Sequence, residues 1–419
     1  MLEKTILDNG IRIITEKMPE VRSATLGVWV NVGSRHDPRG REGMAHFTEH
    51  MLFKGTSRRS ALEIAKEIDA LGGVLNAQTA KEYTVYYTRV LDEYLGKASD
   101  VLFDLFLESL INQDEMEKEK KVVVQEIRMT EDTPDDYITD LFAEAFFQES
   151  ALGIPILGSV DSVGSISRAD ILDFLSDLYS PESIVVAAVG NLDHHQLVDL
   201  AAPRFKDLNA RAGMKPEADR PPVFSGKTRV FNRDIEQVHI TIGTPGSSME
   251  DEARWPYIVL NTMLGGSMSS MLFQEAREKL GLVYSIYSYM SSYRDCGVLA
   301  TYAATTPDHV RQTIDVIAQQ MEKIKKGDFG GISIEDIKTQ IKGNLLLSRE
   351  STVNRMSSLA KNEIYYGREV PVEEVIRNIE QVSASDVVDL ACRIFQRSKI
   401  TMVTLGKLDE EGVGEIPLA

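Results

Sequence analysis

Two histidines and a glutamate lie within five residues of one another near the start of the chain. The segment 46–50 reads HFTEH, so His46 and His50 are four residues apart and Glu49 directly precedes the second histidine. On a helix, residues at this spacing point the same way, and both imidazoles can reach one ion. A carboxylate on that side that does not bind the ion can act as a general base toward water. The pattern therefore indicates metal-assisted hydrolysis, against the alternative of a helix with polar surface histidines.

A catalytic zinc site usually takes a third protein ligand. Glu126 offers one from a stretch with helical character, residues 113–130, and Glu119 lies two turns earlier on the same face. The apolar run 122–124 indicates that this helix is partly buried, and a carboxylate on a buried face needs a partner such as a metal. From spacing alone, however, a solvated acidic face is the better explanation of both glutamates.

The elements that must position these residues are organised as a repeat. Residues 166–193 resemble residues 382–409 at a constant offset of 216, and each copy ends in Gly-x-Leu-Asp. Each copy predicts a helix with a serine N-cap, a short turn, a strand rich in β-branched residues and a second turn. Identical spacing over 28 positions favours duplication, so the two halves are expected to share one fold.

The remaining pattern predicts an α+β protein with two similar domains, each a mainly antiparallel sheet packed with helices. We expect a zinc-binding domain at 1–208, a polar, proline-containing linker at 209–224 and a homologous domain without the zinc motif at 225–419. Strands are expected at 5–15, 24–32, 83–90, 228–232, 239–243, 283–290 and 298–303, and first-half helices at 44–53, 61–71, 92–109 and 113–130.

Composition limits the class of protein and its partners. A length of 419 residues suits two domains of about 200 residues, and 43% hydrophobic with 26% charged residues is an ordinary globular balance. A net charge of −18 argues against nucleic acid as a partner. The sequence contains no run of about 18 apolar residues, so we expect no membrane span. The start of the chain shows no targeting pattern. Two cysteines suit a reducing compartment, and the lack of a targeting pattern fits a bacterial cytoplasm, which is the location we expect.

The motifs taken together resemble a known family. GMAHFTEHMLFKGT at 43–56, with Glu126 at its distance, closely resembles the pitrilysin/insulinase family of zinc peptidases, whose motif inverts the more familiar His-Glu-x-x-His order. Its length and two similar halves look like the processing-peptidase branch, near the mitochondrial processing peptidase beta subunit. Further matches are LGGVLNAQT at 71–79, LGGSMSS at 264–270 and REKLGLVYS at 277–285, so the resemblance covers both halves.

The resemblance implies a cofactor and completes a ligand set. It implies one Zn²⁺ per chain, with Glu126 as the third ligand and Glu119 as a carboxylate that supports a ligand. It also implies two α+β domains and a chamber that admits extended or unfolded polypeptides.

The resemblance further implies residues that contact the substrate. Asn76 and Ala77 match positions on an edge strand beside the zinc helix, where substrate adds as an extra strand. Arg277 and Tyr284 match a pair that contacts the substrate backbone and the developing oxyanion. From the residues alone, Asn76 has the alternative of a turn residue after Gly72-Gly73. A helix-surface arginine at Arg277 and a core tyrosine at Tyr284 would be the preferred interpretations without the resemblance.

We therefore expect a zinc metalloendopeptidase with Glu49 as general base and Tyr284 and Arg277 as oxyanion-stabilising residues. Because the zinc motif and the Arg/Tyr pair lie in different halves, we expect a homodimer in which each second domain completes the partner's site. The alternatives are a non-catalytic assembly subunit, as in respiratory complexes, and a catalytic subunit that needs a distinct inactive partner.

Overall fold

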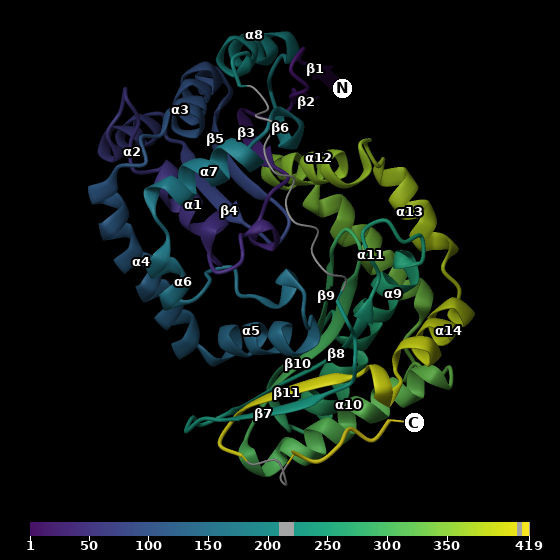
Figure 1. Cartoon of the computed structure of the whole chain (residues 1–419). Coiled ribbons are helices and arrows are strands. Elements are labelled where there is room, and N and C mark those ends of the chain that lie inside the picture. The colour runs from purple at the N-terminus through teal and green to yellow at the C-terminus, as the bar shows by residue number, and fades with distance from the viewer. Residues whose placement is uncertain (209–221, 409–412, 419) are drawn as a thin grey trace. The chain divides into compact units, whose positions relative to one another are not determined.

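The computed structural model describes residues 1–208, 222–408 and 413–418, and these form two compact units (Figure 1). The first unit contains Met1–Met129, the described part of Ile154–Asp219, and Ser348–Glu369. The rest of the described chain forms the second unit, which includes the segment Thr130–Gly153. Each half of the sequence therefore gives one helical segment to the other unit, and contiguous domain boundaries remain a prediction.

The first unit is built on a six-stranded sheet with the order β1-β2-β6-β3-β5-β4. β2 and β6 are parallel, and all other neighbours are antiparallel. The strands are β1 (Leu2–Ile6), β2 (Arg12–Lys17), β3 (Ser23–Val30), β4 (Val74–Thr79), β5 (Thr84–Leu91) and β6 (Ile184–Gly190). The helices of the first half are α1 (Met44–Leu52), α2 (Ala61–Ala70), α3 (Leu95–Glu108), α4 (Gln113–Asp132), α5 (Pro134–Phe146), α6 (Val160–Ser165), α7 (Arg168–Leu178) and α8 (His194–Phe205).

The single strand expected at 5–15 is wrong, because the chain turns back on itself there. β1 and β2 form a hairpin closed by hydrogen bonds from Leu7 N–H to Ile11 O (2.9 Å) and from Gly10 N–H to Leu7 O (2.8 Å). Gly10 has φ of 97°, in the left-handed region that glycine adopts without steric cost. The Asn9-Gly10 pair is a recognised hairpin signal that the strand prediction overlooked.

Alternate residues of the buried strand β3 contact opposite layers of helices. Leu26 and Val28 belong to the core shared with α1 and α3. On the other face, the Trp29 indole N–H donates to Met356 Sδ (2.9 Å), and the Thr25 and Thr352 hydroxyls lie 2.8 Å apart. The second layer is α12 (Thr352–Tyr366), a helix from the second half of the sequence (Figure 1).

Ion pairs at the rim reinforce this docking of α12. Glu363 binds Lys4 Nζ at 2.7 Å, and Arg355 Nε donates to Glu16 at 2.9 Å. Tyr365 O–H donates to the buried carboxylate of Glu82 at 2.9 Å. The first sheet thus obtains one of its two helical layers from residues that come more than 150 positions after its last strand.

The second unit repeats the topology of the first. Its sheet has the order β7-β11-β8-β10-β9, with β7 and β11 parallel and the other neighbours antiparallel. The order matches β2-β6-β3-β5-β4 strand for strand. The strands are β7 (Thr228–Asn232), β8 (Val238–Gly246), β9 (Val283–Ser292), β10 (Gly297–Thr305) and β11 (Thr401–Gly406). The helices of this half are α9 (Arg254–Gly265), the π-helix η5 (Phe273–Lys279), α10 (Val310–Lys325), α11 (Ile334–Ser348), α12, α13 (Val372–Gln381) and α14 (Ala384–Ile394).

The duplication is confirmed at the level of single residues. α7 and α14 begin and end at positions 216 residues apart, and both start with a capping box, on Ser167 and Ser383. Gly190 and Gly406, at the ends of β6 and β11, have φ of 142° and 156°. The last repeat position, Asp409, lies outside the described residues. The α+β class with two similar, mainly antiparallel domains is thus as predicted.

The two halves exchange equivalent helices. The 216-residue offset carries α5 onto residues 350–362, where α12 is found. α5 packs on β8 and β11 of the second sheet, where Phe142 and Phe146 join Val403 and Leu405 in one cluster. Of the predicted linker 209–224, positions 209–221 lie outside the described residues, and Val223 forms a β-bridge with Gln148.

Candidate metal centre

The helix that carries the two histidines starts at a glycine that the local packing requires. Gly43 precedes α1 with φ of 90°, and a Cβ at this position would lie 2.6 Å from the carbonyl oxygen of Leu157. From there the helix buries Phe47 and Met51 in the core. His46, Glu49 and His50 lie on its other side, half-buried.

Three side chains converge there with the geometry of a metal site. Nε2 of His46 and Nε2 of His50 lie 3.9 and 3.5 Å from Oε2 of Glu126 on α4. Two ligand atoms of a tetrahedral zinc ion lie about 3.3 Å apart, from bond lengths of about 2.0–2.1 Å. Oε2 of Glu126 is buried and has no hydrogen-bond partner among the described residues. The donor set and its spacing fit a zinc ion.

Electrostatics shifts the pKa values of the two histidines in opposite directions. Burial, followed by the neighbouring His50, lowers the pKa of His46 to about 3, so its imidazole is neutral. For His50, burial opposes the charge, but the hydrogen bond to Glu119 and the charge of Glu126 outweigh it and raise the pKa.

Glu119 supports His50 from behind. Its Oε1 lies 2.8 Å from His50 Nδ1, and its Oε2 lies 2.6 Å from Lys54 Nζ. Burial favours the neutral acid, yet the hydrogen bonds from His50 and Lys54 outweigh burial and lower the Glu119 pKa. The carboxylate therefore fixes the orientation of the imidazole. Sequence reasoning assigned no role to Lys54, although the residue falls within the matched motif.

Glu49 lies beside the ligand set, not in it. Burial is the main cause of its raised pKa, and a short hydrogen bond from the Thr79 hydroxyl partly opposes that shift. A carboxylate with raised pKa next to a metal site has the basicity expected of a general base. Thr79 is the second contact that sequence reasoning missed, although it too lies in a matched motif.

Asn76 and Ala77 lie on β4, at the edge of the first sheet. Among the described strands, β4 pairs only with β5, so one side of its backbone has no strand partner. α1 packs beside β4. The Asn76 side chain is exposed and accepts a hydrogen bond from Ala77 N–H at 2.8 Å. An edge strand in this position can pair with an extended peptide.

Arg277 and Tyr284 lie together in the second unit. The guanidinium carbon of Arg277 is 5.9 Å from the Tyr284 ring centre and 5.0 Å from that of Phe273. Arg277 belongs to the π-helix η5, a type of element that is frequent at functional sites. The Tyr284 side chain, at the start of β9, is 74% exposed. The expectation that Tyr284 could be a core residue is thereby excluded.

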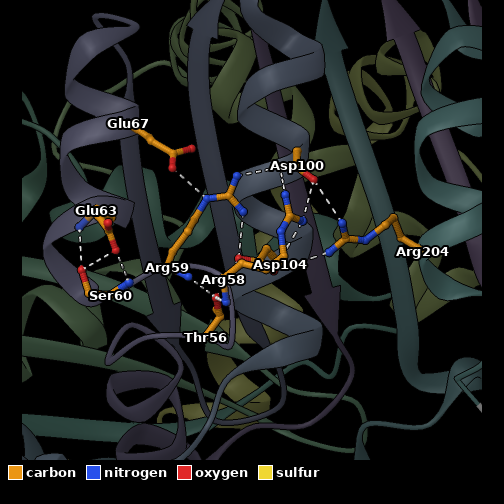
Figure 2. A network of polar contacts seen from close by, with 9 residues as sticks. All are labelled: Thr56, Arg58, Arg59, Ser60, Glu63, Glu67, Asp100, Asp104 and Arg204. Carbon is orange, nitrogen blue, oxygen red and sulfur yellow. Dashed lines mark hydrogen bonds and ion pairs between the residues drawn. The ribbon is translucent and has the colours of Figure 1, made fainter.

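A polar network around the buried Asp104 holds the loop that follows α1 (Figure 2). Asp104 on α3 accepts hydrogen bonds from Thr56 Oγ1 and Arg59 Nη1, both at 2.8 Å. Figure 2 shows Arg59 reaching Glu67 in one direction and Asp100 in the other. The loop after the metal helix is thus tied to two helices of the first unit.

Comparison with known proteins identifies the family. The sequence-family model described as insulinase (peptidase family M16) matches residues 12–160. A second family model, described as peptidase M16 inactive domain, matches residues 165–341. The chain belongs to peptidase family M16. The second match begins near the end of the first half and covers much of the half that carries no zinc motif.

Curated M16 relatives match over nearly the whole chain. An uncharacterized zinc protease of Streptomyces coelicolor is 40% identical over 98% of this chain and 90% of its own length. The uncharacterized zinc protease YmxG of Bacillus subtilis is 40% identical over 94% of this chain and 96% of its own length. An uncharacterized zinc protease from Mycobacterium tuberculosis is 41% identical over 94% of this chain and 91% of its own length.

Solved structures share the M16 fold at lower sequence identity. A protease from Helicobacter pylori has a TM-score of 0.89 at 23% identity, covering 97% of this chain and 99% of that one. A chain of Complex III2 from Candida albicans, with Inz-5 bound, has a TM-score of 0.81 at 20% identity and covers 98% of both chains. Within the described part of this chain, no helix has the length and apolar character needed to cross a membrane.

Proposed function

We propose that this M16 chain is a zinc-dependent metalloendopeptidase that hydrolyses peptide bonds of extended or unfolded polypeptides. The observation that carries the proposal is the convergence of His46, His50 and Glu126 beside Glu49. The names of the curated relatives, zinc proteases, support it.

In this proposal one zinc ion is held by His46, His50 and Glu126. When bound there, it would supply Lewis-acid chemistry that acidifies water and polarises a carbonyl. Glu49 takes the proton from the attacking water at its carboxylate, and its raised pKa equips it to pass that proton to the leaving amine. Glu119 keeps the His50 ring in its binding orientation.

The substrate side of the proposal rests on backbone recognition. The free edge of β4 at Asn76 and Ala77 pairs with any extended chain, because main-chain hydrogen bonds do not depend on sequence. This favours unfolded segments over folded proteins. Arg277 and Tyr284 contact the substrate backbone and the developing oxyanion.

We further propose that the site is completed in trans within a homodimer. The metal residues belong to the first compact unit and the Arg277/Tyr284 pair to the second. A two-fold dimer in which each second domain packs on its partner's first domain would complete two such sites.

The test is digestion of a peptide library by the purified chain, with and without chelator, read by mass spectrometry. Cleavage that chelator abolishes and added zinc restores supports the proposal. Absence of cleavage by the zinc-loaded chain would favour a non-catalytic subunit role. The likeness to a Complex III2 chain concerns the fold alone and does not favour that role. Activity that appears only after a second protein is added would favour a dependent catalytic subunit.

A further inference from the structure

The N-terminus of the metal helix is held by a carboxylate from outside the helix. Gly43 N–H donates to Asp37 Oδ2 at 2.8 Å, and Ala45 N–H donates to Asp37 Oδ1 at 2.9 Å. Gly43 occupies the N-cap position and brings no side chain. Both oxygens of Asp37 therefore bind N–H groups that would otherwise lack a partner at the start of α1.

Asp37 belongs to a turn that is hydrogen-bonded to the residues directly after β4, the strand beside α1. It follows the 3-10 turn Ser34–His36, and its own N–H donates to Ser34 O at 3.2 Å. Ser34 N–H donates to Ala80 O at 3.0 Å, and Arg35 N–H donates to Lys81 O at 2.8 Å. Ala80 directly follows Thr79, the last residue of β4. A cap from within α1 would fix only the helix end, whereas Asp37 also fixes α1 relative to β4.

The two metal-binding histidines are supported differently. Nδ1 of His50 is held by Glu119 at 2.8 Å. Nδ1 of His46 is buried and has no hydrogen-bond partner among the described residues. No hydrogen bond holds its ring, so its position depends on packing against the His50 ring and on the backbone that carries it. The residue before it, Ala45, is one of the two that Asp37 binds.

We propose that Asp37 is a positioning residue for the metal site, which holds His46 in place through the helix backbone as Glu119 holds His50 through its ring. This inference rests on the metal site of the proposed function. In this role Asp37 touches neither the substrate nor the ion. Loss of the contact should weaken metal binding by about 10–100-fold, the usual scale for groups that orient a ligand.

The first test compares zinc affinity in Asp37→Asn and in the wild-type chain by competition with a chelator. An asparagine side chain has one acceptor oxygen, so one of the two N–H groups loses its partner. We expect the affinity to fall about 10–100-fold and the visible spectrum of the cobalt-substituted protein to change.

A matched control separates positioning from ordinary helix capping. Asp193 caps α8 in the same unit, where it accepts from Gln196 N–H at 3.1 Å far from the metal motif in sequence. Asp193→Asn should leave zinc affinity and the cobalt spectrum unchanged. If Asp37→Asn lowers the melting temperature but binds zinc like the wild type, Asp37 is only a structural cap and the inference is wrong.

A second measurement needs no variant. In metal-free wild-type protein, the amide protons of Gly43 and Ala45 should exchange as slowly as that of Phe47, which bonds inside the helix to Gly43 O at 2.8 Å. Fast exchange at both would overturn the inference even if Asp37→Asn fails to fold. A wild-type chain that binds no zinc would instead refute the proposed metal site, and with it the role of Asp37 toward that site.

Discussion

The hydroxyl of Thr79, the last residue of β4, donates a hydrogen bond to the carboxylate of Glu49 on α1. The contact joins the proposed general base to the strand proposed to bind substrate. Because the hydrogen bond stabilises the carboxylate anion, it opposes the upward pKa shift that burial causes.

Thr79→Val should therefore raise the Glu49 pKa further. A general base acts only when deprotonated, so the acidic limb of the kcat/KM profile should move to higher pH. A lost hydrogen bond to a charged group costs about 1.5–3 kcal/mol, which corresponds to a shift of about one to two pH units and, below the shifted limb, to roughly a 10- to 100-fold loss of kcat/KM. Thr79→Ser, which keeps the hydroxyl, is the control. An acidic limb at the same pH in wild type and Thr79→Val would show that the contact does not tune Glu49.

Glu49→Gln tests the base itself. The amide keeps the shape of the side chain but cannot accept the proton, so kcat should fall by about 10²–10⁴-fold or more. Zinc content and melting temperature should stay close to wild type, because Glu49 is not in the ligand set. Normal turnover in a zinc-loaded Glu49→Gln protein would remove Glu49 from this role.

The two carboxylates of α4 should differ in their effect on metal content. Glu126→Gln should lower zinc occupancy strongly, since its oxygen lies among the donor atoms. Glu119→Gln should weaken zinc binding or activity by about 10–100-fold, as the loss of a supporting contact does. Elemental analysis of both purified variants decides the matter. Full zinc in Glu126→Gln and none in Glu119→Gln would reverse the two assignments.

The network after α1 should contribute to stability more at its buried carboxylate than at its exposed one. Asp104 is fully buried and binds Thr56 and Arg59, so Asp104→Asn should destabilise by about 1–3 kcal/mol in urea unfolding. Glu67→Gln, at the exposed end of the same arginine, should cost less than about 1 kcal/mol. Equal losses in both variants would contradict the ranking by burial.

Completion in trans can be tested by mixing two impaired variants. Glu49→Gln and Tyr284→Phe should each have little activity alone. If Tyr284 acts on the partner's metal site, a mixed dimer carries both lesions at one site and leaves the other intact, so activity should return on mixing. No recovery after verified subunit exchange would refute the shared site.

Local patterns predicted the α+β class and the helix that carries His46, Glu49 and His50, because both can be read from periodicity within short segments. The spacing of His46 and His50 on one helix face and the 216-residue repeat needed no knowledge of long-range packing. Asp37 was missed because its side chain binds two backbone N–H groups at the start of a helix that begins seven residues later, and no side-chain pattern marks such a contact. The exchange of α5 and α12 was also missed, since an amphipathic pattern shows that a face is buried but not which sheet covers it.

Because the two halves exchange helices, part of the first half must wait during synthesis for residues that are made much later. The first sheet is complete once β6 ends at Gly190, but α12, which covers Trp29, ends only at Tyr366. At roughly 5–20 residues per second, that face of the sheet stays uncovered for about 10–35 seconds on the ribosome. Phe142 and Phe146 of α5 wait still longer for β11, which ends at Gly406. The first half of the nascent chain therefore exposes two apolar surfaces, at Trp29 and at Phe142 and Phe146, which a holding chaperone could bind until β11 is made.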